Sequence, residues 1–245
     1  MKSVSFTDRD QLWRDMESGQ ANDWDLIVIG GLPLSTDLAR ELAQPLLSLG
    51  EVQATYGIVR QVADLRGGHD EWFGNRSARF RKSLRQADRR ASEAQLRLVD
   101  VSSDPDAYRR CVRIEERSWK GQIEDGITGP GMHQFFVVMT LRLKQQGRFR
   151  ATVAMIGDID VGFFFGGVRN RRYRGLQLSF VESARPLSVS HLLQHHTIRQ
   201  LVTEGVHTYD LGMDMDYKQR WADRTEPSMS LIVRRPSIRA RRRIG

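Results

Sequence analysis

The sequence has little of the chemistry that cross-links or anchors small proteins. Its single cysteine, Cys111, has no partner in the chain, which excludes an internal disulfide or a cysteine-rich zinc site and favours a reducing compartment. The longest apolar run, residues 161–168, is far shorter than the ~20 residues that cross a bilayer. Residues 1–20 have no apolar segment after a basic start, so we expect no signal peptide and a cytoplasmic location.

The composition is that of a folded protein with unevenly distributed charge. Of the 245 residues, 40% are apolar and 28% are charged, which excludes a disordered or collagen-like chain. The net charge of +8 arises from two segments. Residues 76–90 hold seven basic residues and one acidic residue, and residues 234–243 hold six arginines and no acid. Such clusters favour a phosphate-bearing ligand or a local anionic partner; a solvated linker and tail are the alternative.

The hydrophobic pattern predicts an ordered series of strands and helices from residue 95 onward. In chain order we expect a strand at 96–101, helices at 105–121 and 132–147, strands at 148–156, 160–168 and 172–181, a helix at 188–204, a strand at 207–213, a helical turn at 216–222 and a strand at 228–235. The links between the three consecutive strands are short enough for hairpins, which predicts an antiparallel meander. Upstream, the pattern predicts strands at 24–29 and 51–59 around a helix at 35–49.

Several residues at the joints of this series carry a family resemblance. They are the segment Glu115–Gly121, the pair Phe135-Phe136, the helix start Ser188–Leu193 and the segment Tyr209–Trp221, which ends in a YK..W pattern. In this order they resemble the GNAT acyltransferase superfamily, and within it the CelD-like and Fem-type subgroup with two GNAT-like halves. The resemblance covers residues 76–235 and implies a mixed-sheet α/β fold.

The resemblance also implies a division of the chain. We expect a shortened N-terminal GNAT-like half at 1–75, a basic linker helix at 76–92, one complete GNAT domain at 93–235 and a basic tail at 236–245.

Acyl transfer to an amine needs a base, an acid for the leaving group and a group that stabilises the oxyanion. Glu115 falls inside an apolar helical stripe, where a carboxylate is hydrogen-bonded, neutral or paired; it is a candidate base, and an ion pair with Lys218 or an arginine is the alternative. The resemblance implies that Tyr217 protonates the leaving group and that Lys218 serves the acyl carbonyl or a donor phosphate. The predicted catalytic residues are Glu115, Tyr217 and Lys218.

The connection at 183–189 leads from a strand into a helix, whose free amides and dipole favour an anion. An ordinary connection is the alternative. The residues predicted to bind the donor are Arg185, Ser188, Val189, Ser190 and His191. This loop lacks the glycine-rich turn of acetyl-CoA-using relatives, so the fold is better supported than the identity of the donor. The predicted substrate-binding residues are Trp119, Asp214 and Trp221, with packing the alternative for Trp221 and helix capping for Asp214.

The histidines and the cysteine predict no further chemistry. His191 and His195 are four residues apart on a helix, but no acidic residue separates them in the zincin pattern and no third ligand is evident, so no metal is expected. His196 shares an arc with apolar residues, which predicts a core histidine. Cys111 faces an apolar stripe and is a poor nucleophile candidate.

The predicted function is transfer of an acyl group from a thioester, with acyl-CoA as the co-substrate, to an amine. One alternative is Fem-like aminoacyl transfer, with tRNA bound by the basic segments 76–90 and 234–243. A second alternative is a degenerate, non-catalytic scaffold. A homodimer is a further expectation, because a shortened half leaves an open sheet edge or an apolar face.

Overall fold

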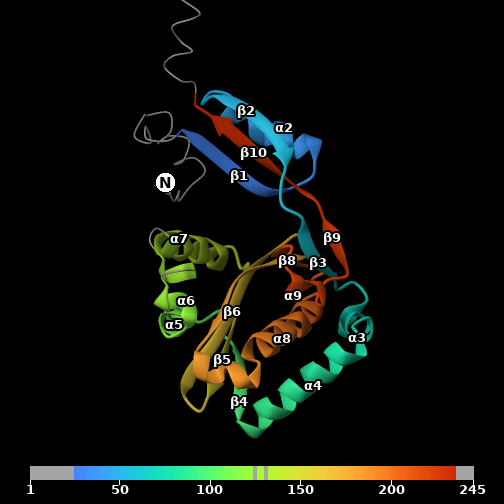
Figure 1. Cartoon of the computed structure of the whole chain (residues 1–245). Helices are drawn as coiled ribbons and strands as arrows, with labels where there is room; N and C mark the ends of the chain where they lie inside the picture. The colour runs from blue at the N-terminus through green and yellow to red at the C-terminus, as the bar shows by residue number, and fades with distance from the viewer. Residues whose placement is uncertain (1–24, 124–125, 130–131, 236–245) are drawn as a thin grey trace, which may run out of the picture. The chain divides into compact units, whose positions relative to one another are not determined.

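A computed structural model of the chain describes residues 25–123, 126–129 and 132–235. Residues 1–24 of the predicted N-terminal half and the predicted basic tail at 236–245 lie outside this description. The chain divides into two compact units (Figure 1). The larger unit spans Gln61–Arg224, and the described part of the smaller unit comprises residues 25–60 and 225–235.

The smaller unit is a three-stranded antiparallel sheet covered by one helix. Its elements are β1 (Leu26–Pro33), α2 (Thr36–Leu46), β2 (Glu51–Tyr56) and β10 (Ser228–Arg234). The strand order is β1-β10-β2, so the last strand of the chain is the central one. Leu46 from α2 packs with Leu231 and Val233 from β10, which gives this unit its own small core.

The larger unit is built on a seven-stranded mixed sheet of order β4-β5-β6-β7-β8-β3-β9. Its strands are β3 (Arg60–Asp64), β4 (Leu96–Asp100), β5 (Phe149–Ile156), β6 (Ile159–Arg169), β7 (Arg172–Phe180), β8 (Thr208–Met213) and β9 (Arg224–Glu226). Its helices are α3 (Gly68–Gly74), α4 (Ala78–Glu93), α5 (Ala107–Glu116), α6 (Trp119–Gln122), α7 (Met132–Gln145), α8 (Val189–Thr203) and α9 (Asp216–Gln219). Strands β5 to β7 form the predicted antiparallel meander, and β4 pairs antiparallel with β5 beside it.

Helices cover both faces of the sheet at its centre. Figure 1 shows α5, α6 and α7 on one side of β5 and β6, and α8 with α4 on the other. Strand β6 is therefore buried on both faces, and Phe163, Phe164 and Phe165 are all buried in succession. A strand with two covered faces reads as a continuous apolar run rather than an alternating one, as this segment does.

Strands β7 and β8 pair only briefly before they part. They are parallel neighbours over three residue pairs, the last of which joins Arg174 to Asp210. The register between β6 and β7 shifts just beyond this point, because Gly166 pairs with Gly175 and Phe165 pairs with Gln177. The extra residue, Leu176, forms a β-bulge, which bends a strand away from its neighbour. The bulge thus explains why β7 leaves β8 here.

Most predicted elements are present, with three differences. The helix expected over 105–121 is two helices, because α5 ends at Glu116 and the Ser118 hydroxyl caps α6 by accepting from the amides of Lys120 and Gly121. Strands β3 and β9 and helix α3 had no counterpart in the prediction. Residues 61–75 lie in the larger unit and β10 lies in the smaller one. The boundaries of the compact units therefore differ from the predicted boundaries at residues 75 and 235. The division into two GNAT-like halves stays a prediction. No helix within the described residues has the length and apolar character of a membrane span.

The core histidine on α8 is His195, not the predicted His196. His195 is 2% exposed, whereas His196 is only half-buried. The Nε2 atoms of His195 and His69 lie 2.9 Å apart. Burial, with the positive charge of Arg199 and the neighbouring histidines, lowers the pKa of His195 to about 3.

This shift predicts a loss of stability in mild acid. Because the unfolded chain takes up a proton near pH 6.5 and folded His195 does not, the free energy of unfolding decreases as the pH falls below 6.5. From pH 7 to pH 5 we expect His195 to contribute a loss of about 2 kcal/mol. Urea denaturation at both pH values measures it. The variant His195→Asn should flatten the dependence and His133→Asn should not; an unchanged slope in His195→Asn would contradict the assignment.

Candidate functional site

A cleft opens where β7 and β8 separate. This cleft has a volume of about 530 Å³ and lies wholly within the larger unit. Its walls come from residues 175–180 of β7, from β8, from the start of α8 and from the segment around α9. Crevices where neighbouring strands of an α/β sheet part are common ligand sites. We therefore take the cleft as the candidate active site.

One wall of the cleft is an open strand edge. The carbonyl of Leu178 on β7 accepts a hydrogen bond from Lys120 Nζ at 3.0 Å instead of from a neighbouring strand. The N–H and C=O of one strand residue point to the same edge, so the Leu178 amide also faces the cleft. Neither Leu178 nor Lys120 was predicted as a site residue. The cleft offers a backbone donor beside a lysine.

The structure brings Tyr217 and Lys218 into the cleft together. Both belong to α9, which follows β8 directly, and both line the cleft. Lys218 Nζ donates to the carbonyl of Met213 at 3.1 Å and lies 5.6 Å from the centre of the Tyr217 ring. Burial, reinforced by the Arg174 guanidinium, lowers the pKa of Lys218, and burial raises the pKa of Tyr217. Tyr217 therefore keeps its proton at neutral pH and can donate it.

A buried aspartate holds the end of β8 in place below the cleft. Asp210 is 1% exposed and accepts from Arg174 Nη1 at 2.6 Å, from Arg172 Nη2 at 3.2 Å and from the Gly212 amide at 2.9 Å. These charge-assisted bonds compensate for the loss of water around the carboxylate. Asp210 thereby fixes the backbone from which α9 emerges.

Glu115 is buried as predicted, but it lies behind the wall of the cleft. It is 0% exposed, and its Oε1 accepts from the Ile127 amide at 3.0 Å and from Gln177 Nε2 at 2.9 Å. Its Oε2 has no hydrogen-bond partner within the described residues. Gln177 lines the cleft and Glu115 does not, so Glu115 reaches the site through Gln177. No sequence motif marks Gln177.

Gly126 makes room for this carboxylate. Its φ is +86°, and a Cβ built there would lie 2.2 Å from Glu115 Oε1 and 2.5 Å from Gln177 Nε2. We expect Gly126→Ala to lower the free energy of unfolding by about 2–4 kcal/mol, because left-handed strain adds to the clash. Gly147, at φ +66° in open space, is the matched control, for which strain alone predicts about 1–2 kcal/mol. Chemical denaturation compares the two variants, and equal losses would contradict this role of Gly126.

The residues predicted to bind the donor are dispersed. Ser190 and His191 line the cleft, and burial, with the charge of Arg220, lowers the pKa of His191. Val189 is fully buried, and the Ser188 hydroxyl accepts from Arg90 at 3.1 Å.

Arg185 does not line the cleft. It lies in the 3-10 helix Glu182–Leu187, and its guanidinium pairs with Glu182, with Nη2 at 2.8 Å from Oε2.

The predicted substrate-binding residues also differ in position. Trp119 is 45% exposed at the cleft, and Trp221 is 1% exposed at its base, where it stacks on Trp72. Asp214 lies outside the cleft lining and accepts from Gln61 Nε2 at 2.5 Å.

The cysteine and the candidate metal ligands can be examined in the same way. Cys111 is fully buried, and burial raises the pKa of its thiol, so it stays protonated. Within the described residues, no three metal-ligating side chains gather in one place.

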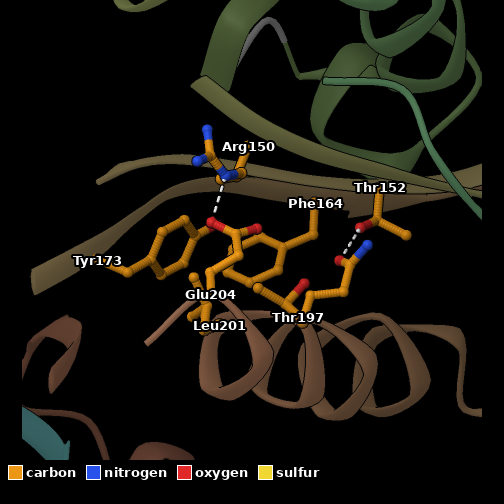
Figure 2. A pocket seen from close by; sticks show the side chains of 8 residues that line it. Arg150, Thr152, Phe164, Tyr173, Thr197, Leu201 and Glu204 are labelled. Carbon is orange, nitrogen blue, oxygen red and sulfur yellow. Dashed lines mark hydrogen bonds and ion pairs between the residues drawn. The ribbon is translucent and has the colours of Figure 1, made fainter. Parts of the chain in front are cut away.

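A second cavity, shown in Figure 2, is too small for a substrate. It lies between β5 to β7 and α8, with a volume of about 10 Å³. The ion pair of Arg150 with Glu204, at 2.6 Å, lies on one side of it. The buried hydroxyls of Tyr173 and Thr197 have no hydrogen-bond partner within the described residues. Polar walls and this volume suit about one water molecule.

The fold has counterparts among known proteins. A family model described as an acetyltransferase (GNAT) domain matches residues 78–219, whereas no curated protein matches the sequence. The chain is similar to a solved domain assigned as the C-terminal part of a lysylphosphatidylglycerol synthetase from Agrobacterium fabrum, with a TM-score of 0.58 and 15% identity over 96% of this chain and 75% of that one.

Two further structures show the same fold. FemX has a TM-score of 0.58 and 13% identity over 91% of this chain and 75% of its own. A tandem GNAT protein from the clavulanic acid biosynthesis pathway has a TM-score of 0.50 and 13% identity, covering 94% of this chain and 70% of that chain. These findings confirm the predicted mixed α/β fold and the predicted resemblance to tandem and Fem-type GNAT proteins. The bulged strand, the parting of β7 from β8 and the match over residues 78–219 place the chain in the GNAT acetyltransferase family.

Proposed function

We propose that this protein transfers an acyl group from a thioester, with acyl-CoA as the donor, to an amine. The observation that carries the proposal is the cleft, where an open strand edge faces Tyr217 and Lys218. An extended amide-containing arm can pair with the edge of β7 as an added strand does. Acyl transfer itself is the activity to which the GNAT domain match points.

The cleft residues suggest a division of labour during transfer. Attack of the amine nitrogen on the thioester carbonyl forms the new C–N bond and places negative charge on the carbonyl oxygen. The Leu178 amide and the Lys218 ammonium are the donors that would stabilise this charge. Collapse of the intermediate breaks the C–S bond, and Tyr217 would protonate the leaving sulfur.

The acceptor amine must lose a proton before or during attack. Glu115 is the predicted base, and its position behind Gln177 favours an indirect role. Because Glu115 Oε1 accepts from Gln177 Nε2, Glu115 holds the Gln177 side chain in one orientation, in which Gln177 Oε1 could accept a hydrogen bond from the amine. His191 lines the cleft, and its lowered pKa keeps the imidazole neutral and able to accept a proton. A pH–rate profile of Glu115→Gln and His191→Gln separates the two roles.

Ligand-dependent unfolding tests the donor. A ligand at 100 times its dissociation constant should raise the free energy of unfolding by about 2.7 kcal/mol. Thermal unfolding is measured with acetyl-CoA, longer acyl-CoAs, free CoA and deacylated tRNA. Stabilisation by one acyl-CoA, followed by its turnover with an amine, supports the proposal. An absence of stabilisation with every ligand would favour the non-catalytic scaffold.

Aminoacyl transfer from tRNA is the second candidate, favoured by the exposed basic side chains of α4. Lys82 and Arg85 are both exposed, whereas Arg81 donates to the carbonyl of Gly74 at 2.7 Å. If tRNA is the donor, the double variant Lys82→Ala/Arg85→Ala should bind tRNA more weakly and with a smaller salt dependence. Full acyl-CoA turnover in this variant without any RNA would remove this candidate.

A further inference from the structure

A third hollow, distinct from the small cavity of Figure 2, lies beside the cleft, and its charged lining residues are all basic. It has a volume of about 440 Å³ and is lined by Ser77, Arg79, Phe80, Ser83 and Arg220. We call it the arginine pocket. It contains two guanidinium groups, two hydroxyls and no carboxylate among its lining residues. The sequence placed possible tRNA contacts along residues 76–90, which include Arg79, but predicted no ligand contact for Arg220.

The side chains that line the arginine pocket come from two segments far apart in the chain. Arg79 and Ser83 are four residues apart on α4, so they lie on the same face of that helix. Arg220 directly follows α9. Both arginines are exposed, and neither forms an ion pair with a carboxylate in the described part of the chain. Two guanidinium groups without carboxylate partners are free to bind a doubly charged anion through paired N–H donors.

The arginine pocket is next to the cleft. Trp221 lines the cleft and packs edge-on against Phe80, which lines the arginine pocket, with their ring centres 4.8 Å apart. Trp221 also lies beside His191 of the cleft, with ring centres 5.8 Å apart. The two hollows are thus lined by aromatic side chains that contact each other. A ligand long enough to reach from one hollow to the other would occupy both.

The expected anion site at the start of α8 offers less free charge. Arg185 is the cation of that segment, and its guanidinium is paired with Glu182. A guanidinium that already holds a carboxylate has fewer N–H donors left for a phosphate.

We propose that the arginine pocket binds a phosphoryl group of the acyl donor whose reactive end lies in the cleft. The inference rests on the proposed function and extends it. CoA carries a phosphate monoester and a diphosphate, and the 3′ end of tRNA carries successive phosphodiesters with one negative charge each; two guanidinium groups can bind either. What the proposal adds is the position of the group, on Arg79 and Arg220 rather than on Arg185.

Calorimetric titration with adenosine 3′,5′-diphosphate tests the pocket without the reactive arm. Because each charge-assisted contact contributes substantially to affinity, we expect Arg79→Ala and Arg220→Ala each to weaken binding about tenfold or more. Arg79→Lys should lose less, since it keeps the charge but not the paired donors. Arg89→Ala is the matched control, because it removes the same charge from an exposed position of the same helix.

Arg185→Ala tests the competing site directly. The proposal would be overturned if Arg79→Ala and Arg220→Ala bind the probe as tightly as wild-type protein, or if Arg89→Ala loses as much affinity as they do. It would also be overturned if only Arg185→Ala loses affinity, or if wild-type protein does not bind the probe. Thermal unfolding of each variant shows that the fold is retained.

Turnover separates the pocket from the proposed function. With acyl-CoA, Arg79→Ala and Arg220→Ala should raise KM and change kcat little. Wild-type protein that binds the probe through these arginines but transfers no acyl group would refute the function and keep the pocket. Acyl transfer with an unchanged KM for acyl-CoA in both variants would support the proposed function and refute the arginine pocket as the phosphoryl site. Displacement of the probe by deacylated tRNA assigns the phosphoryl group to RNA, and displacement by CoA alone assigns it to the coenzyme.

Discussion

Replacing Lys218 with alanine is expected to lower kcat by about 10²- to 10³-fold and to change KM for the acyl donor little. The ammonium lines the cleft close to Tyr217, and it would act on charge that develops only in the transition state. A loss confined to kcat is the signature of such a group. Steady-state kinetics with saturating amine measures it.

The control for Lys218→Ala is Lys82→Ala. Both changes remove one ammonium group from the larger unit, but Lys82 is exposed on α4 and outside the cleft lining. Lys82→Ala should keep the wild-type kcat with acyl-CoA. If Lys218→Ala raises KM instead and leaves kcat intact, Lys218 binds the donor rather than the oxyanion.

Replacing Trp221 with alanine is expected to lower the free energy of unfolding by about 3–5 kcal/mol. Trp221 is 1% exposed and packs between the stacked Trp72 ring and the edge-on Phe80 ring. Its backbone carbonyl also accepts from Trp72 Nε1 at 3.2 Å. Removing the indole leaves a cavity beside Trp72 and Phe80. Urea denaturation gives the value.

Trp119→Ala is the matched control for this prediction. Trp119 is also a tryptophan of the cleft, but it is 45% exposed, so its removal should cost less than about 1 kcal/mol. A similar loss in both variants would mean that burial of Trp221 does not stabilise the fold.

Sequence periodicity predicted the strands β4 to β8 well, because their apolar residues alternate or run continuously between clear turns. It missed β3, a short segment whose partners in the sheet come from more than 140 residues later in the chain. It also joined α5 to α6, because both share one apolar stripe and only the Ser118 cap separates them. Local patterns do not show pairing between distant segments.

The same limit applies to the site. Tyr217 and Lys218 were predicted by their motif, and they reach the cleft because α9 follows β8 at the point where the strands part. Gln177 and Leu178 were missed, because a cleft-facing strand residue carries no motif and a backbone amide has no sequence signal. Arg185 was predicted to face the donor, but Glu182, three residues earlier, pairs with it. Such a pairing depends on side-chain orientation that the 3-10 helix sets.

The strand order has a consequence for synthesis of the protein. Strand β10 is central in one sheet, and in the other β3 lies between β8 and β9, so both sheets need residues beyond 207. Pairing that joins segments so far apart in the chain forms late and slowly. While the ribosome is still translating the middle of the message, β1 and β2 have no strand to join them, and β6 exposes apolar residues. We expect nascent chains that stop before residue 208 to bind chaperones and to be cleaved readily by proteases.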